Sequence, residues 1–220
     1  MTPAVQLYGL ARSVYTRIAR LALEEKGVSY TLHEVEIFGP GGVPAEHCKR
    51  HPFGRIPALA HADFQLYETA VITRYVDEAF QGPALQPADA ARRARMNQIV
   101  GVLDAYAYRP MIWGVVVPRM RRRPGDPEPD EARIAEALTA SARALDALDA
   151  LIASGPHLLG SELTLADLHA YPMLGCFAFA PEGAALLRQH TTLQRWWEAM
   201  QQRPSVQRTR SLFDTAPAQK

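Results

Sequence analysis

HPFGRIPAL at residues 51–59 and LYETAVI at residues 66–72 are the two stretches that decide how this chain folds. Ile56-Pro57 joins a turn to an apolar run, and we expect this bond to be cis, which would fix a tight bend. The second stretch begins β-prone and turns helical at Thr69, the expected N-cap. A helix N-terminus presents unpaired N–H groups and a positive dipole end, so it suits a carboxylate. A bent backbone beside such an anion site is a way to hold a small peptide.

The first eighty or so residues alternate between strand-like and helix-like patterns. We expect strands over residues 5–8, 30–37, 57–61 and 64–67, helices over residues 14–26 and 69–80, and a Gly/Pro-rich loop over residues 38–44. Gly27 is the expected end signal of the first helix. The order β-α-β, loop, β-β-α predicts a small α/β domain over residues 1–81.

The pattern changes at residues 82–89, where two prolines and a glycine mark a linker. Residues 90–220 are expected to form an all-α domain. Its helical candidates are residues 90–108, 131–153, 165–179 and 193–202. Thr164 with Asp167 gives the third of these a capping-box start, so we assign Asp167 to folding.

The composition argues against several classes of partner. The net charge is only +1, which gives no support for binding to nucleic acid or to an anionic membrane. The basic cluster at residues 119–123 runs into acidic residues and prolines, which indicates a solvated, charge-balanced loop. Cys48 and Cys176 lack metal-ligand spacing, and we expect reduced thiols rather than a disulfide. We therefore expect no metal. The sequence shows no signal peptide and no apolar run of membrane-spanning length, so we expect a cytoplasmic protein.

Three motifs, in this order and spacing, resemble the cytosolic glutathione transferase family over nearly the whole chain. They are SVYTR at residues 13–17, PFGRIPAL at residues 52–59 with Glu68-Thr69, and LTLADL at residues 163–168. Serine-type members, phi-like and related bacterial ones, look most similar. The resemblance implies a thioredoxin-like N-terminal domain and a C-terminal helical bundle domain that lines the second-substrate pocket.

Ser13 lies between the first strand and the first helix, and the resemblance makes it the catalytic residue. Its hydroxyl would donate a hydrogen bond to the glutathione thiolate, which attacks the substrate. Lowering a thiol pKa of about 8.5 by about two units requires about 2.7 kcal/mol. A hydrogen bond to a charged acceptor supplies roughly 1.5–3 kcal/mol, and the helix dipole adds to it. The alternatives are that Ser13 merely caps the helix, or that Tyr8 or Tyr15 shares the task.

The resemblance also implies a glutathione-binding set, which is Arg55, Ile56, Pro57, Glu68 and Thr69. The Ile56 backbone would pair with the cysteinyl backbone across the Pro57 bend. Glu68 would take the ammonium group, and Thr69 with its helix N–H would take the γ-glutamyl carboxylate. Plain capping by Thr69, and an acid favoured by the helix dipole at Glu68, are the alternatives.

The chain departs from phi-like members at one place. They carry a basic pair after the second strand that holds the glycine carboxylate, and an ungapped alignment places Gly42 and Val43 there. His47, Lys49 or Arg12 is the candidate to replace it. If nothing does, glutathione should bind weakly.

The expected function is conjugation of glutathione, as co-substrate, to an electrophilic and fairly apolar compound. The resemblance also implies a role in detoxification and a homodimer. Candidates for the second-substrate pocket are Tyr15, Tyr106, Met111, Trp113 and Phe177, although such residues are more often core. An isomerase of the zeta type is one alternative; those members carry an extra serine and a cysteine beside the catalytic serine, which Arg12 and Val14 replace here. A non-catalytic binding module is the other, and the missing basic pair leaves it open.

Overall fold

The computed structural model describes residues 5–120 and 128–214, which form two compact units. The first unit extends to Gln86 and also includes Pro204–Ser211, and the second runs over Pro87–Arg203 and resumes at Leu212. The sequence-based boundary assigned residues 204–211 to the helical domain, and here the structure differs. Most of the charge-balanced loop expected after residue 119 lies outside the described residues.

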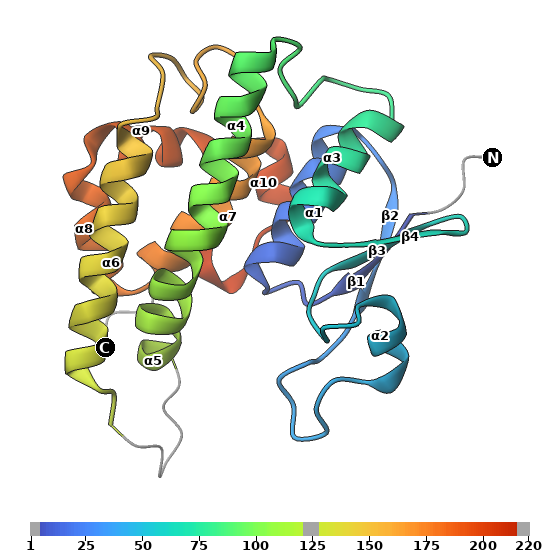
Figure 1. The fold of residues 1–220 in the computed structure, drawn as a ribbon, viewed down its shortest axis with the longest axis horizontal. Coiled ribbons are helices and arrows are strands. Elements are labelled where there is room, and N and C mark those ends of the chain that lie inside the picture. The colour runs from blue at the N-terminus through green and yellow to red at the C-terminus, as the bar shows by residue number, and fades with distance from the viewer. Residues whose placement is uncertain (1–4, 121–127, 215–220) are drawn as a thin grey trace. The chain divides into compact units, whose positions relative to one another are not determined.

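The first unit is a four-stranded sheet with helices. Its elements are β1 (Val5–Gly9), α1 (Val14–Glu25), β2 (Tyr30–Glu34), α2 (Ala45–Arg50), β3 (Ala58–His61), β4 (Phe64–Tyr67), α3 (Thr69–Ala79) and α10 (Pro204–Arg208). The strand order is β2-β1-β3-β4, with β1 and β2 parallel and the other pairs antiparallel. Within this unit, α1 and α3 lie together on one side of the sheet and α2 lies on the other (Figure 1). This is the thioredoxin-like arrangement that the sequence predicts.

The core of the first unit forms where the apolar faces of α1 and α3 meet the sheet. Leu7, Ile18 and Ile72 are fully buried there. A buried ion pair adds to this packing, since Lys26 Nζ lies 3.1 Å from Asp77 Oδ1. Lys26 is the C-cap residue of α1, so the pair joins the end of α1 to α3.

The second unit is entirely helical in its described part. Its elements are α4 (Ala90–Val102), η1 (Leu103–Ala107), η2 (Arg109–Val116), α5 (Val117–Met120), α6 (Glu131–Asp149), α7 (Leu165–Ala178), α8 (Pro181–Gln189), α9 (Thr191–Met200) and η3 (Leu212–Asp214). The two segments η1 and η2 are π-helical and continue the helix past Tyr108, where the sequence predicted its end. Gly114 lets η2 approach α6, because a Cβ there would lie 2.5 Å from the Cβ of Ala137.

Helix α7 is the centre of the second unit, with every residue from Leu165 to Phe177 buried. The predicted capping box is confirmed, because Asp167 Oδ2 accepts the backbone N–H and the hydroxyl of Thr164 at 2.8 and 2.9 Å. Asp167 Oδ1 accepts the backbone N–H of Leu158 and the indole N–H of Trp196, both at 2.8 Å. One buried carboxylate therefore holds three segments of this unit together.

Two expectations about the chain as a whole can be compared with the structure. Cys48 and Cys176, both within the described ranges, are not joined by a disulfide. None of the helices formed by residues 5–120 and 128–214 is both long and apolar enough to cross a bilayer.

Candidate active site

Three chain segments come together at one edge of the sheet in the first unit. Tyr8 pairs with Ala58, and Ala58 pairs with Tyr67, so these residues form one row across β1, β3 and β4. β1 and β4 leave the sheet at this row, and β3 enters it there. The turn before α1, the segment before β3 and the residue before α3 therefore lie side by side. The sequence placed its catalytic and glutathione-binding candidates on these three segments.

Ser13 forms the N-cap of α1, with an extended backbone at φ −72° and ψ 133°. Its Oγ accepts the backbone N–H of Thr16 at 3.3 Å. A hydroxyl has two lone pairs and one hydrogen, so capping leaves the hydrogen available. Among the described residues, none accepts this hydrogen from the half-buried Ser13 side chain. Capping and donation to a thiolate are therefore compatible roles.

The segment before β3 is bent at Pro57, and the Ile56-Pro57 peptide bond is cis, as predicted. Both residues are buried, whereas Arg55 is exposed. His47 of α2 forms a hydrogen bond to this segment, because its Nε2 lies 2.7 Å from the carbonyl oxygen of Arg55. The His47 side chain is almost completely buried, at 1% exposure.

Helix α3 begins at Thr69, and its N-cap is one residue earlier than predicted. Glu68 is the N-cap, and Thr69 is the first helical residue, so the assignment of Thr69 as N-cap is wrong. Glu68 has φ 70°, a left-handed conformation that costs a non-glycine residue of order 1–3 kcal/mol and that recurs at functional sites. The Glu68 side chain makes no cap hydrogen bond. Glu68 is exposed, and the start of α3 has no side-chain cap, which suits an anion.

His51 is a further residue at this edge, and its role was missed at the sequence level. Its ring is buried and lies 4.8 Å from that of Tyr67, centroid to centroid. Burial lowers the pKa of His51, and the nearby Glu68 carboxylate opposes that shift. The signal was available, because His51 directly precedes the PFGRIP motif.

The three candidates for replacing the missing basic pair all have other partners. Arg12 forms an ion pair with Glu36 at 2.5 Å, and Lys49 forms one with Glu46 at 2.9 Å. His47 is buried and bound to the Arg55 carbonyl, as described above. None of the three therefore stands unengaged beside the bend.

Gly42 and Val43 lie in the loop before α2. Gly42 is exposed, with φ 68°. Val43 is close to the bend, because a Cβ added to Gly54 would lie 3.1 Å from Val43 Cγ2. The Val43 side chain therefore lies against the turn that precedes the bend.

The two tyrosines near Ser13 differ in their surroundings. The Tyr8 ring stacks on His33, with centroids 4.9 Å apart, and the Arg50 guanidinium carbon lies 4.3 Å from the Tyr8 ring centroid. These contacts favour packing on the strand as the role of Tyr8. Tyr15 is half-buried in the first turn of α1.

The pocket candidates of the second unit divide into two groups. Met111 and Phe177 are fully buried, which favours the core alternative for both. Tyr106 is 68% exposed and Trp113 is 41% exposed, so both present aromatic surface. In the described ranges, no group of three His, Cys, Asp or Glu side chains comes together as metal ligands.

Comparisons with known proteins give the family. The model for the glutathione S-transferase N-terminal domain matches residues 7–84, and the model for the C-terminal domain matches residues 105–204. Glutathione S-transferase 4 of Zea mays is 30% identical over 205 residues, which are 93% of this chain and 91% of that protein. The chain belongs to the glutathione S-transferase family, in agreement with the resemblance that the three motifs indicated.

Solved structures agree with this assignment. Glutathione transferase F7 from Populus trichocarpa matches with a TM-score of 0.80 and 27% identity, over 94% of this chain and 97% of that one. A glutathione S-transferase-I bound to lactoylglutathione matches with a TM-score of 0.77 and 26% identity, over 94% and 98% of the two chains.

Proposed function

We propose that the protein conjugates glutathione, through its thiolate, to an electrophilic and fairly apolar carbon atom. The observation that carries the proposal is the Ser13 hydroxyl, which caps α1 through its oxygen and keeps its hydrogen for an acceptor. A thiolate at the start of α1 would accept that hydrogen and would also lie at the positive end of the helix dipole. The combination lowers the thiol pKa, so more of the nucleophile is present at neutral pH.

The remaining residues at the sheet edge supply binding. The Ile56 backbone and the Pro57 bend hold the cysteinyl part of glutathione, and Arg55 lies on the exposed side of the same segment. Glu68 takes the ammonium group, and Thr69 with the uncapped start of α3 takes the γ-glutamyl carboxylate. Both charged groups of the γ-glutamyl residue are thereby held, and the thiol of the peptide is directed to Ser13.

Affinity for glutathione is expected to be modest. Arg12, His47 and Lys49 have other partners, so none of these three described residues replaces the basic pair for the glycine carboxylate. One missing charge-assisted hydrogen bond lowers the affinity roughly ten- to a hundredfold. Among the pocket candidates of the second unit, the exposed Tyr106 and Trp113 are the ones we retain for the second substrate, because Met111 and Phe177 are fully buried.

The protein acts as a cytoplasmic homodimer in detoxification under this proposal. Three apolar side chains of the first unit support a second copy as partner, because Phe53, Phe64 and Val71 are 70%, 49% and 44% exposed. Apolar surface of this kind is commonly covered in an oligomer. Light scattering at several protein concentrations tests the dimer independently of the activity.

Retention on immobilised glutathione, followed by an assay with 1-chloro-2,4-dinitrobenzene, tests the function. Both retention and conjugation are expected. Retention without conjugation would favour the non-catalytic binding module. Retention with isomerisation of a cis-dicarboxylic alkene, and no conjugation, would favour the zeta-type isomerase, although Arg12 and Val14 occupy the positions of that type's extra serine and cysteine.

A further inference from the structure

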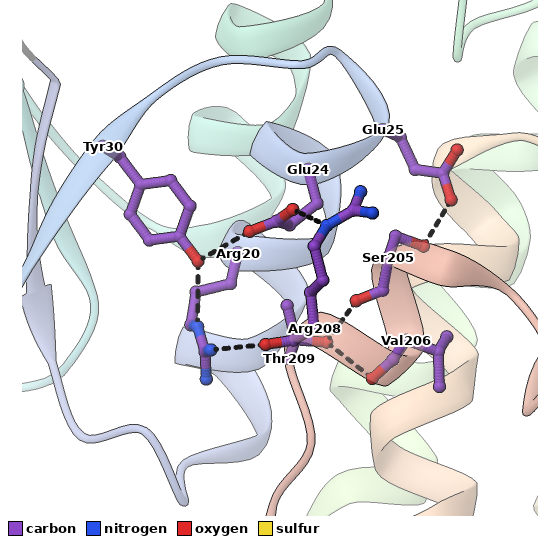
Figure 2. A network of polar contacts seen from close by, with 8 residues as sticks. All are labelled: Arg20, Glu24, Glu25, Tyr30, Ser205, Val206, Arg208 and Thr209. Atoms are coloured by element: carbon purple, nitrogen blue, oxygen red, sulfur yellow. Dashed lines mark hydrogen bonds and ion pairs between the residues drawn. The ribbon is translucent and has the colours of Figure 1, made fainter.

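Most cations of the first unit already have a partner in the part of the chain that the structure describes. Two of them belong to the network that joins α1 to α10. Arg20 Nε donates to the Tyr30 hydroxyl at 3.1 Å, and Arg208 Nε donates to Glu24 Oε2 at 2.5 Å (Figure 2). This network lies beside the start of β2, which pairs with the start of β1, whereas the proposed glutathione site lies where β1 ends. Neither arginine therefore serves that site.

Arg55 differs from these cations. Its side chain is exposed and has neither a hydrogen-bond partner nor an ion-pair partner within residues 5–120 and 128–214. Its backbone is fixed, because the Arg55 carbonyl oxygen lies 2.7 Å from Nε2 of the buried His47. A guanidinium has five donors in a planar fork that matches a carboxylate. The Arg55 side chain is thus suited to an anionic group of a ligand at this segment.

Glu68 carries the opposite charge at the same edge of the sheet. It is exposed and, like Arg55, has no side-chain partner among the described residues. Both charges act on the buried His51 ring, since burial lowers the pKa of His51, the Glu68 carboxylate opposes that shift and the Arg55 guanidinium adds to it. Two opposite charges near one ring, not paired with each other, suit a zwitterionic ligand with an ammonium group at Glu68 and a carboxylate at Arg55.

The register of the sheet gives the order of these groups. Ala58 pairs with Tyr67 in an antiparallel ladder, so Pro57 and Glu68 are the next residues outward on the two strands. Arg55 lies two residues beyond Pro57, away from the ladder. Under the proposed function, the γ-glutamyl residue is held at Glu68 and the cysteinyl residue at the backbone that precedes Pro57. The third residue of an extended tripeptide therefore lies on the Arg55 side.

We propose that the Arg55 guanidinium binds the glycine carboxylate of glutathione. This inference rests on the proposed function and adds a specificity-determining residue to it. Arg55 supplies one cation where phi-like members have a basic pair, so one contact of that pair is replaced and the other is not. A modest affinity for glutathione agrees with this arrangement. Ser13, Arg55 and Glu68 then serve the thiol, the glycine carboxylate and the ammonium group of one ligand.

Calorimetry with glutathione and with its glycine amide, on the wild-type protein and on Arg55→Met, tests the proposal. The wild-type protein should bind the amide about tenfold or more weakly, because the amide lacks only the glycine carboxylate. Arg55→Met should bind glutathione about tenfold more weakly than the wild type, and its affinities for the two ligands should agree within about twofold. Arg55→Lys keeps a charge and should retain part of the preference for glutathione. These substitutions are at an exposed side chain and leave the Arg55 carbonyl in place.

Arg210→Met is the matched control, because Arg210 is another exposed arginine of the first unit that has no partner in the described ranges. It should change neither affinity, and a loss as large as that of Arg55→Met would overturn the proposal. Equal binding of both ligands by the wild type would do so too. A loss in Arg55→Met of the same size for glutathione and for the amide would assign Arg55 to the γ-glutamyl carboxylate instead.

These results separate the inference from the proposed function. In each of the overturning results above, glutathione still binds, so the proposed function stands and only the role of Arg55 is lost. An absence of glutathione binding by the wild-type protein would contradict the proposed function and the role of Arg55 together.

Discussion

The imidazole Nε2 of His47 lies 2.7 Å from the carbonyl oxygen of Arg55. Because a carbonyl oxygen only accepts hydrogen bonds, this nitrogen carries the hydrogen. The bond joins α2 to the segment that ends in Pro57, and it is formed by a ring that is 1% exposed. His47 is therefore a positioning residue for the proposed glutathione site, rather than the replacement cation that the sequence suggested.

Replacing His47 with leucine should weaken glutathione binding, although the His47 side chain itself is not expected to contact glutathione. The Arg55 carbonyl loses its partner, so we expect the free energy of unfolding to fall by about 1–3 kcal/mol and KM for glutathione to rise about tenfold. Urea denaturation and steady-state kinetics measure the two effects. His47→Gln keeps a donor at that place and should recover most of the loss. An equal loss in both variants would contradict the positioning role.

Introducing a cation at position 43 should improve glutathione binding. Val43 contacts the turn at Gly54, so the ammonium group of Val43→Lys can reach the glycine carboxylate beside the bend. An increase in affinity of about tenfold or more is expected from one charge-assisted hydrogen bond. Calorimetry with glutathione and with its glycine amide measures it, and the amide should gain nothing. Phe38→Lys, at an exposed site in the same loop, is the charge-matched control.

His51 should make the protein less stable in acid. Burial lowers the folded-state pKa of His51, whereas the unfolded chain takes up its proton near pH 6.5. Below that pH the unfolded state binds more protons, so the free energy of unfolding falls as the pH drops toward the folded pKa. His51→Phe keeps a ring against Tyr67 and should flatten this slope, which denaturation at a series of pH values below 6.5 reveals. An unchanged slope would contradict the account.

Asp167→Ala should strongly destabilise the second unit. Four donors lose their acceptor in the interior, and we expect a loss of about 3 kcal/mol or more in the free energy of unfolding. Chemical denaturation measures it. Glu136→Ala, at an exposed position on α6, should change stability by about 0.5 kcal/mol or less. A loss below about 1 kcal/mol in Asp167→Ala would mean that capping alone is its contribution.

The sequence predicted where helices begin better than where they end. The starts of α1, α3, α4, α6 and α7 agree with the expected residues, and β4 agrees at both ends. The helices α2, α8 and α10 were not predicted. α8 and α10 begin with Pro181 and Pro204, and α2 follows Pro44. Proline is favourable at the first position of a helix, but in a sequence it is easily taken as a break.

The candidate site was predictable to the extent that motifs and caps determine it. The cis bond before Pro57 and the position of Ser13 at the start of α1 agree with the expectation. The positive φ of Glu68 was not predictable, because tertiary packing rather than local propensity imposes it on a non-glycine residue. Burial of Met111 and Phe177 likewise depends on how helices pack, which an aromatic pattern alone does not reveal.

The most direct test is the pKa of the glutathione thiol when it is bound, followed through the ultraviolet absorbance of the thiolate against pH. In the wild-type protein we expect a value about two units below that of free glutathione, because the Ser13 hydroxyl donates to the thiolate. In Ser13→Gly, which weakens the helix cap by only a few tenths of a kcal/mol, the value should return close to that of free glutathione, and turnover should fall about tenfold or more. An identical pKa in the wild type and in Ser13→Gly would contradict the central role of Ser13 and direct attention to Tyr15 or Tyr8.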